Sequence, residues 1–234
     1  MQIPQEQRAR AEAAMPGVTP CATPDWITVD AAYATQMAEK SRLLSGKRSA
    51  VVAALPGTKA ALAELDAHVL DLLKARPDFD VQADTIERPD GVIVSRGEPD
   101  LLARLLQEDL CILQKRGDRH VLTAATLCFP AGWTLSEKIG RPLLDIHAPV
   151  QRYTSDVARR VQRLFDGVQA ARPIWRANLL NYDNPALFQP HKEADPRPVG
   201  SAVSPFERSE RQTLFRLPHT QAVVFAIHTT VVRR

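Results

Sequence analysis

The C-terminal end of the chain consists of two long β-prone runs joined by a short turn. Residues 206–216 and 221–232 alternate polar with apolar side chains or are rich in Val, Ile and Thr, and the sequence LPHT at residues 217–220 separates them. This pattern predicts an antiparallel hairpin. A second hairpin is predicted where the turn-forming sequence RGDR joins residues 110–115 to residues 120–129. The second half of the chain should therefore contain an antiparallel sheet.

The first hundred residues show the three- and four-residue spacing of amphipathic helices. This spacing covers residues 33–44 and 58–74, with Thr58 placed as an N-cap and Pro77 closing the second helix. A further helix is predicted over about residues 99–108. Residues 1–100 are therefore expected to be mainly helical.

Between the hairpins the pattern predicts loops, a strand and one long helix. A short helix is expected to start at Thr134 or Ser136 and to end at Ile139, followed by an irregular stretch over residues 143–151. Residues 155–171 form a strongly amphipathic helical pattern, and residues 174–182 resemble a strand. We expect an α+β fold with residues 1–234 in one domain, mainly helical over 1–100, with a mostly antiparallel sheet and one long crossing helix over 105–234.

Composition excludes several classes of protein. The net charge is only +3 and the basic residues are scattered, so nucleic acid is not an expected partner. No stretch approaches the ~20 apolar residues that cross a bilayer, and the N-terminus lacks a secretory pattern, so we expect a cytoplasmic protein with no membrane partner. Phosphate-binding glycine motifs and hydrolase motifs are absent. Cys21, Cys111 and Cys128, without CxxC spacing, are expected to be thiols.

Six histidines could bind a metal, and their contexts differ. His147 lies between Ile146 and the sequence APV, which restrains its backbone and keeps its imidazole neutral, as a haem iron requires. On the residues alone, a structural loop histidine remains the favoured alternative. His228 alternates along a strand and is expected to be a hydrogen-bonded or surface side chain. The others lie where exposed side chains are usual: His68, His120, His191 and His219.

Glu210 belongs to a polar row on a predicted strand. The two-residue period places it on the same face as Arg208, Gln212 and Leu214, so the row could face a cavity. A solvated strand face with cross-strand ion pairs is the alternative, which the residues alone favour. Trp133 is expected by default to pack in the core.

Several segments match one family in order along nearly the whole chain. The most specific is the block CFP-x-GW-x3-EK-x-GRPL-x3-IH-x-PV within residues 127–150. The weaker segments are DWITVDAAYATQMAEKSRLL from Asp25, QEDLCIL from Gln107, IWRAN from Ile174, the later NPALFQP, and ERQTLFRLPHTQAVVFAI from Glu210. Together they resemble the haem-dependent oxidative N-demethylases, which include the large subunits of dimethylamine monooxygenase.

The resemblance implies a PAS-like antiparallel sheet that holds haem b. The family's axial histidine corresponds to His147, and Trp133 and Arg141 of the same block become candidate cofactor-binding residues. The family's acidic residue corresponds to Glu210, which could hold an ammonium substrate or pass protons. Glu210 and its neighbour Arg211 are therefore the catalytic candidates.

The implied reaction is the O₂-dependent removal of a methyl group from a small secondary amine, such as dimethylamine, as formaldehyde. It needs two electrons, yet the chain has no flavin or nicotinamide motif and only three cysteines. We therefore expect NADPH, flavin and iron–sulfur centres to act through a separate reductase.

Two features depart from the family's pattern. Leu179 stands where relatives usually have a tryptophan, and the chain ends at Arg234 where relatives commonly continue into a helical segment. We expect the geometry around the haem to differ accordingly. A haem-based gas sensor or carrier, and a haem-less binding protein of the same fold, are the alternative functions.

Overall fold

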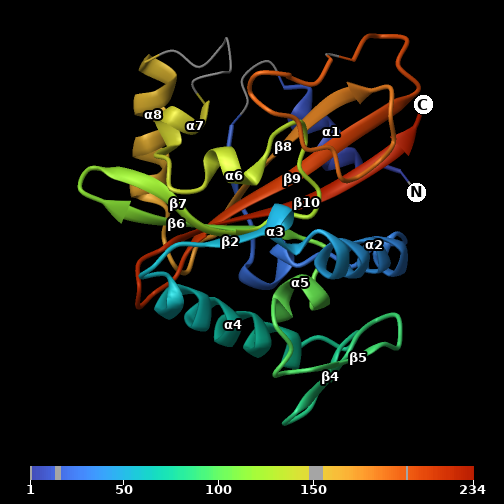
Figure 1. The fold of residues 1–234 in the computed structure, drawn as a ribbon, viewed down its shortest axis with the longest axis vertical. Helices are drawn as coiled ribbons and strands as arrows, with labels where there is room; N and C mark the ends of the chain where they lie inside the picture. Colours follow the sequence, from blue (N-terminus) through green and yellow to red (C-terminus); the bar gives the residue numbers. More distant parts are fainter. Residues whose placement is uncertain (1, 14–16, 148–154, 199) are drawn as a thin grey trace.

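The computed structural model describes residues 2–13, 17–147, 155–198 and 200–234; for residues 147 and 155–158 it describes only the backbone. The fold is α+β, and its centre is a seven-stranded antiparallel sheet (Figure 1). In spatial order the strands are β1 (Thr19–Pro20), β8 (Ile174–Tyr182), β9 (Phe206–Arg216), β10 (Val223–Arg233), β6 (Asp109–Arg116), β7 (Arg119–Thr126) and β2 (Val52–Ala54).

One side of the sheet, which we call the α4 face, is covered mainly by N-terminal elements. They are α1 (Gln5–Ala11), the 3₁₀ helix η1 (Thr23–Trp26), α2 (Tyr33–Gly46), α4 (Lys59–Lys74) and α5 (Leu101–Leu105). The largest apolar core cluster lies here, because residues such as Leu65 and Leu105 pack against Val224 and Ala226 of β10. Beyond α5, a small sheet contains β3 (Asp80–Val81), β4 (Thr85–Glu87) and β5 (Ile93–Ser95), while the short α3 (Arg48–Val51) precedes β2.

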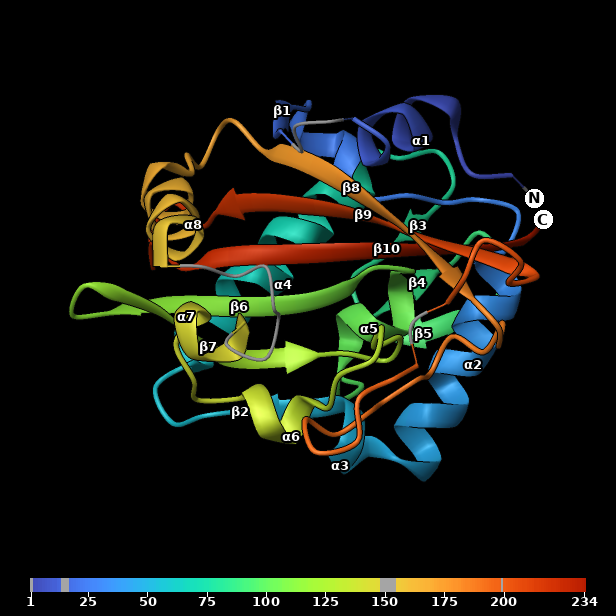
Figure 2. The ribbon, with the colours of Figure 1, turned by 90° about the horizontal axis from the view of Figure 1, so that it is seen from above.

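The opposite side, the α8 face, is covered by α6 (Leu135–Lys138), α7 (Leu143–His147) and α8 (Ser155–Gly167). Figure 2 shows these helices in front of the strands and α4 behind them, with α8 over one end of β9 and β10. A second apolar cluster joins Phe165 at the end of α8 to Leu214 and Val223 of the sheet. The stripe of apolar side chains on α8 is therefore buried against the sheet, as its pattern predicts.

The strands that carry the polar row pair without interruption. β9 pairs with β10 from Arg216↔Val223 to Phe206↔Arg233, and with β8 from Leu214↔Ile174 to Phe206↔Tyr182. With no register shift in either ladder, side chains alternate strictly between the two faces. Which residues share a face can therefore be read from their positions.

Several predicted elements are confirmed with small changes at their ends. The strands over 174–182 and 206–216, both hairpins, and the helices over 33–44 and 58–74 are present, the last with Thr58 at its N-cap position. The Thr58 hydroxyl donates to the Leu55 carbonyl rather than capping the helix.

Three expectations about elements were wrong. The helix expected over 99–108 spans only Leu101–Leu105, since Gln107 and Glu108 turn their side chains to hydrogen bonds with the 28–30 segment. The stretch expected to be irregular from residue 143 begins with α7, and its residues 148–151 lie outside the described part. The α8 helix ends at Gly167 instead of residue 171.

Within the described ranges, no helix combines the length and apolar character needed to span a membrane.

Candidate active site on the α8 face of the sheet

Glu210 lies near the middle of β9, opposite Asn178 of β8 and Thr229 of β10. Alternation places its side chain on the α8 face together with Arg208 and Gln212, as the sequence predicts. Its exposed fraction is only 7%, so the solvated strand face that was the alternative is excluded.

Amide groups hold the Glu210 carboxyl group from both sides. Asn178 Nδ2 and Gln212 Nε2 each donate to Oε2 at 3.0 Å. Asn178 also accepts the Glu210 backbone N–H through Oδ1 at 2.9 Å, which fixes the amide orientation. Among the described residues, Oε1 has one partner, an ion pair with Arg208 at 3.5 Å. Because a carboxylate can accept about two hydrogen bonds per oxygen, Oε1 retains capacity for a donor on a ligand.

Arg208 connects this polar row to two loops. Its guanidinium donates to the carbonyls of Phe129 and Leu187 and lies 5.6 Å from the centre of the Tyr182 ring. The Phe129 backbone N–H in turn donates to Asp109 Oδ2 at 2.6 Å. The CFP and NPALF sequences are thus both fixed to β9 by one 1%-exposed arginine, two residues from Glu210.

Several buried polar atoms around Glu210 have no hydrogen-bond partner. On the α8 face near Glu210, the atoms without a partner among the described residues are Arg176 Nε, Tyr182 Oη, Arg208 Nε and Thr229 Oγ1. Buried polar groups in proteins are nearly always hydrogen-bonded, so these four atoms, which share a face with Glu210, are candidates for contact with polar ligand atoms. Burial also raises the pKa of the Tyr182 hydroxyl, which therefore remains a neutral donor.

The end of α7 is clamped by side chains from the EK-x-GR sequence. Lys138 Nζ donates to the Ile146 carbonyl at 2.8 Å, and Arg141 Nη2 donates to the Asp145 carbonyl at 3.0 Å. Both cations also bind the carboxylate of Glu193, whose pKa is lowered, chiefly by the hydrogen bond from Lys138. These contacts satisfy carbonyls at the C-terminal end of the helix, where a positive charge is favourable.

His147 is the last residue of this clamped helix, directly after Ile146. Its side chain lies outside the described part of the structure. Ile146 itself packs against the apolar cluster that contains Leu214 and Ile227, the neighbours of the polar row on β9 and β10. Trp133, the other candidate of the same block, packs against this cluster too and remains partly exposed. The structure thus brings Trp133, Arg141 and the backbone of His147 to the same side of the sheet as Glu210.

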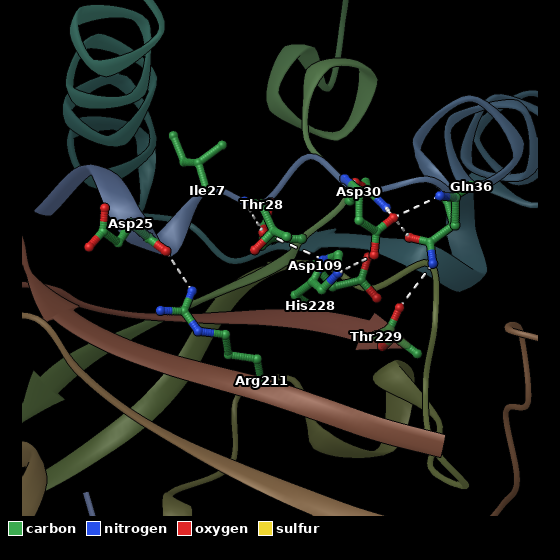
Figure 3. Close-up of polar contacts among 12 residues, drawn as sticks. Asp25, Ile27, Thr28, Asp30, Gln36, Asp109, Arg211, His228 and Thr229 are labelled. Carbon is green, nitrogen blue, oxygen red and sulfur yellow. Dashed lines mark hydrogen bonds and ion pairs between the residues drawn. The ribbon is translucent and has the colours of Figure 1, made fainter. Parts of the chain in front are cut away.

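Arg211 does not join this group. Because it follows Glu210 on β9, it points to the α4 face, where it donates to the Asp25 carbonyl at 2.6 Å and lies 4.9 Å from the centre of the Trp175 ring (Figure 3). Leu179 points to the same α4 face. Leu179, which stands where the family usually has a tryptophan, therefore lies on the side of the sheet away from Glu210.

The remaining family segments build a buried network behind the sheet. His228 Nε2 lies 3.1 Å from Asp30 Oδ2, and Gln36 donates to the Thr229 carbonyl. Figure 3 shows both contacts. Asp30 also binds Gln107, and Lys40, which is completely buried, pairs with Asp109 at 3.1 Å. The expectation of a hydrogen-bonded His228 is confirmed, and the segments DWITVD, QEDLCIL and VVFAIH meet in this network.

Three of the histidines expected to be exposed are not: His68, His120 and His191. His120 is completely buried against Phe165 and 2.8 Å from Gln162, because the β6–β7 hairpin packs under α8. His68 is half-buried and stacks near Phe215. Burial lowers the pKa of both imidazoles. His219 is exposed as expected, and His191 is partly buried.

The cysteines are free, and two of them are buried. Burial raises the pKa of Cys111 and raises that of Cys128 to about 12, so both remain thiols.

Sequence reasoning missed four contributors to the site: Arg176, Asn178, Lys138 and Glu193. Arg176 and Asn178 could have been found by applying the two-residue period to IWRAN. Glu193 carries no local signal, because it reaches Lys138 and Arg141 from a proline-rich loop.

A comparison with family models finds one match that covers most of the chain. Residues 17–233 match the family described as haem-dependent oxidative N-demethylase, alpha subunit-like.

Proposed function

The chain belongs to the haem-dependent oxidative N-demethylase alpha-subunit-like family, and from this membership we propose that it is an enzyme that removes a methyl group from a small secondary amine. In this proposal residues 1–234 act as one domain, and haem b lies against the α8 face of the sheet in the manner of a PAS-like domain. The observation that carries the proposal is the buried Glu210, which two amides hold on the same face of the sheet that α7 covers.

The residues of the α8 face fit haem. Its apolar surface would lie against the cluster that includes Ile146, Leu214 and Phe225. Its polar edge would meet the buried atoms that have no partner in the protein, among them Arg208 Nε and Thr229 Oγ1. The family is described as haem-dependent, in agreement with this distribution of apolar and polar groups.

His147 is the proposed axial ligand. Lys138 and Arg141 hold the two carbonyls that precede it, so they fix the direction in which the chain leaves α7. Fixing the backbone of a ligand by neighbouring hydrogen bonds is a general way to orient it. Trp133, on the edge of the same apolar cluster, would contact the haem.

Glu210 is the proposed residue for the substrate. Its Oε1 can accept a hydrogen bond from the ammonium form of a secondary amine, while Asn178 and Gln212 keep Oε2 in place. A carboxylate so placed can also take the proton that the amine loses. Arg211 has no part in this proposal, since it binds Asp25 on the other face.

Haem would supply the reductive activation of O₂ and the oxidation of the methyl group. The overall reaction turns a methylamine group, O₂, two electrons and two protons into the demethylated amine, formaldehyde and water. The electrons require a partner, which we propose to be a reductase that carries flavin and an iron–sulfur centre and uses NADPH.

The test measures formaldehyde and O₂ consumption in one mixture. It contains the haem-loaded protein, such a reductase, NADPH and dimethylamine or another small secondary amine. We expect formaldehyde to form in step with O₂ uptake and to require both the protein and the amine. A haem spectrum that responds to CO or O₂, with no formaldehyde from any small secondary amine, would replace the proposal by a gas-binding function.

A further inference from the structure

Arg176 lies on β8, beside the polar row of β9, and is the diagonal cross-strand neighbour of Glu210. It is two residues from Asn178 on β8, and its partner in the ladder is Gln212. Alternation therefore puts Arg176 and Glu210 on the same α8 face, with their Cβ atoms about 7 Å apart, as is usual for diagonal neighbours in a sheet. Both side chains are long enough to reach one small molecule between them.

Arg176 also differs from the other charges near Glu210 in having no compensating partner among the described residues. It makes no hydrogen bond or ion pair with any described residue, and its Nε is buried. Its neighbours differ: Arg208 binds two carbonyls and pairs with Glu210. Arg216, on the same face, binds the carbonyls of Val168 and Phe165.

The missing partner is an anion. A guanidinium that has lost part of its hydration is destabilised unless a hydrogen-bond acceptor replaces the water. Its planar fork of N–H donors matches a carboxylate, which it binds with two parallel hydrogen bonds. Because Arg208 already balances Glu210, Arg176 leaves the row with an excess of one positive charge.

We infer that Arg176 is a carboxylate-binding residue of the site. The carboxylate can come from a haem propionate or from the substrate, which would then be an N-methylated amino acid with its ammonium group on Glu210. The inference deepens the proposed function and rests on it, since both carboxylates would bind in the proposed haem site.

Two titrations distinguish the sources, each with Arg176→Gln and with Arg172→Gln as the control. Arg172 is exposed and lies just before β8, so its replacement removes the same charge outside the row. The first titration compares the affinity of the apoprotein for haem b and for haem with both propionates esterified. The second measures the binding of N-methylglycine and of dimethylamine by calorimetry, with and without haem.

If the partner is a propionate, wild type should bind haem at least about tenfold tighter than its ester, and Arg176→Gln should remove this preference. If the partner is a substrate carboxylate, wild type should prefer N-methylglycine to dimethylamine by a similar factor, which Arg176→Gln should again remove. Arg172→Gln should keep the wild-type ratios in both cases.

The inference is overturned if Arg176→Gln changes neither ratio. This outcome is separate from a failure of the proposed function. A protein that binds no haem refutes the haem enzyme, and calorimetry with N-methylglycine still decides whether Arg176 binds a carboxylate.

Discussion

At the scale of single residues, Glu210 differs from the nearby Glu207 in the partners that its carboxylate has. Glu207, three positions away on the same strand, points to the α4 face and pairs with Arg8, which lowers its pKa. Glu210 is held by two amides and an arginine, and one of its oxygens has room for a further donor. The first carboxylate is engaged in a contact within the fold, whereas the second is the one that we propose binds a ligand.

Glu210→Gln should therefore lower kcat/KM for a secondary amine by about 10- to 100-fold, because a hydrogen bond to a charged group contributes ~1.5–3 kcal/mol. Its haem content and absorption spectrum should match wild type. Steady-state formaldehyde assays measure the first quantity and absorption the second. Glu207→Gln, the matched control on the same strand, should keep the wild-type kcat/KM; an equal loss in both variants would remove Glu210 from substrate binding.

Asp66 provides a prediction about pH and stability. It lines a cavity of about 290 Å³ on the α4 face, and burial raises its pKa from 3.8 to about 6. The folded state thus binds the proton of Asp66 more tightly than the unfolded state does. The resulting contribution to the free energy of unfolding is fully present below about pH 4 and is lost as the pH rises through 6.

Asp66→Asn should consequently be more stable than wild type at pH 7, by about 1–2 kcal/mol after allowance for solvent screening. The difference should shrink toward zero at pH 4. Urea unfolding at both pH values, on protein in the same haem state, measures it. A difference that is independent of pH would show that Asp66 carries no raised pKa.

At the scale of elements, the sequence predicts the helices and strands that have a local periodic pattern. It misses features that depend on contacts with residues far away in the sequence. The strand over Ile174–Tyr182 and the helix over Lys59–Lys74 follow from periodicity alone. The short α7 was missed because its carbonyls are satisfied by Lys138 and Arg141 rather than by a capping pattern within it. Likewise, Arg211 was proposed beside Glu210 because the two are adjacent in sequence, although adjacent residues of a strand face opposite ways.

The contacts of Lys138 and Arg141 with the end of α7 should contribute more to stability and to haem retention than an exposed ion pair does. Lys138→Met removes the donor to the Ile146 carbonyl and to Glu193, and should cost about 2 kcal/mol of unfolding free energy and speed haem loss. Lys115→Met removes an exposed pair with Asp166 and should cost under ~1 kcal/mol, with haem loss unchanged. Urea unfolding and transfer of haem to an acceptor protein measure both effects. Equal effects in the two variants would mean that the clamp does not position the haem ligand.

At the scale of the whole molecule, one antiparallel sheet separates two different environments. The α4 face carries the larger apolar cluster and the buried network around Asp30 and His228. The α8 face carries Glu210, the buried Arg176 Nε and the end of α7. The first face supplies structural support, and the second supplies the groups that would bind cofactor and substrate.

Haem should stabilise the molecule as a whole, because a ligand that binds only the folded state raises the free energy of unfolding. A free haem concentration of about 100 times Kd should add ~2.7 kcal/mol and raise Tm by roughly 5–10 °C. Differential scanning calorimetry with and without haem measures the shift. An unchanged Tm under saturating haem would contradict a site built on the central sheet.

The central claim, that His147 holds haem on the α8 face, is tested most directly by absorption spectra of haem-reconstituted wild type, His147→Ala and His219→Ala, where His219 is the exposed control. We predict that wild type and His219→Ala share one Soret spectrum. His147→Ala should lose or shift this band, and added imidazole should restore it. An unchanged Soret band in His147→Ala would contradict the account.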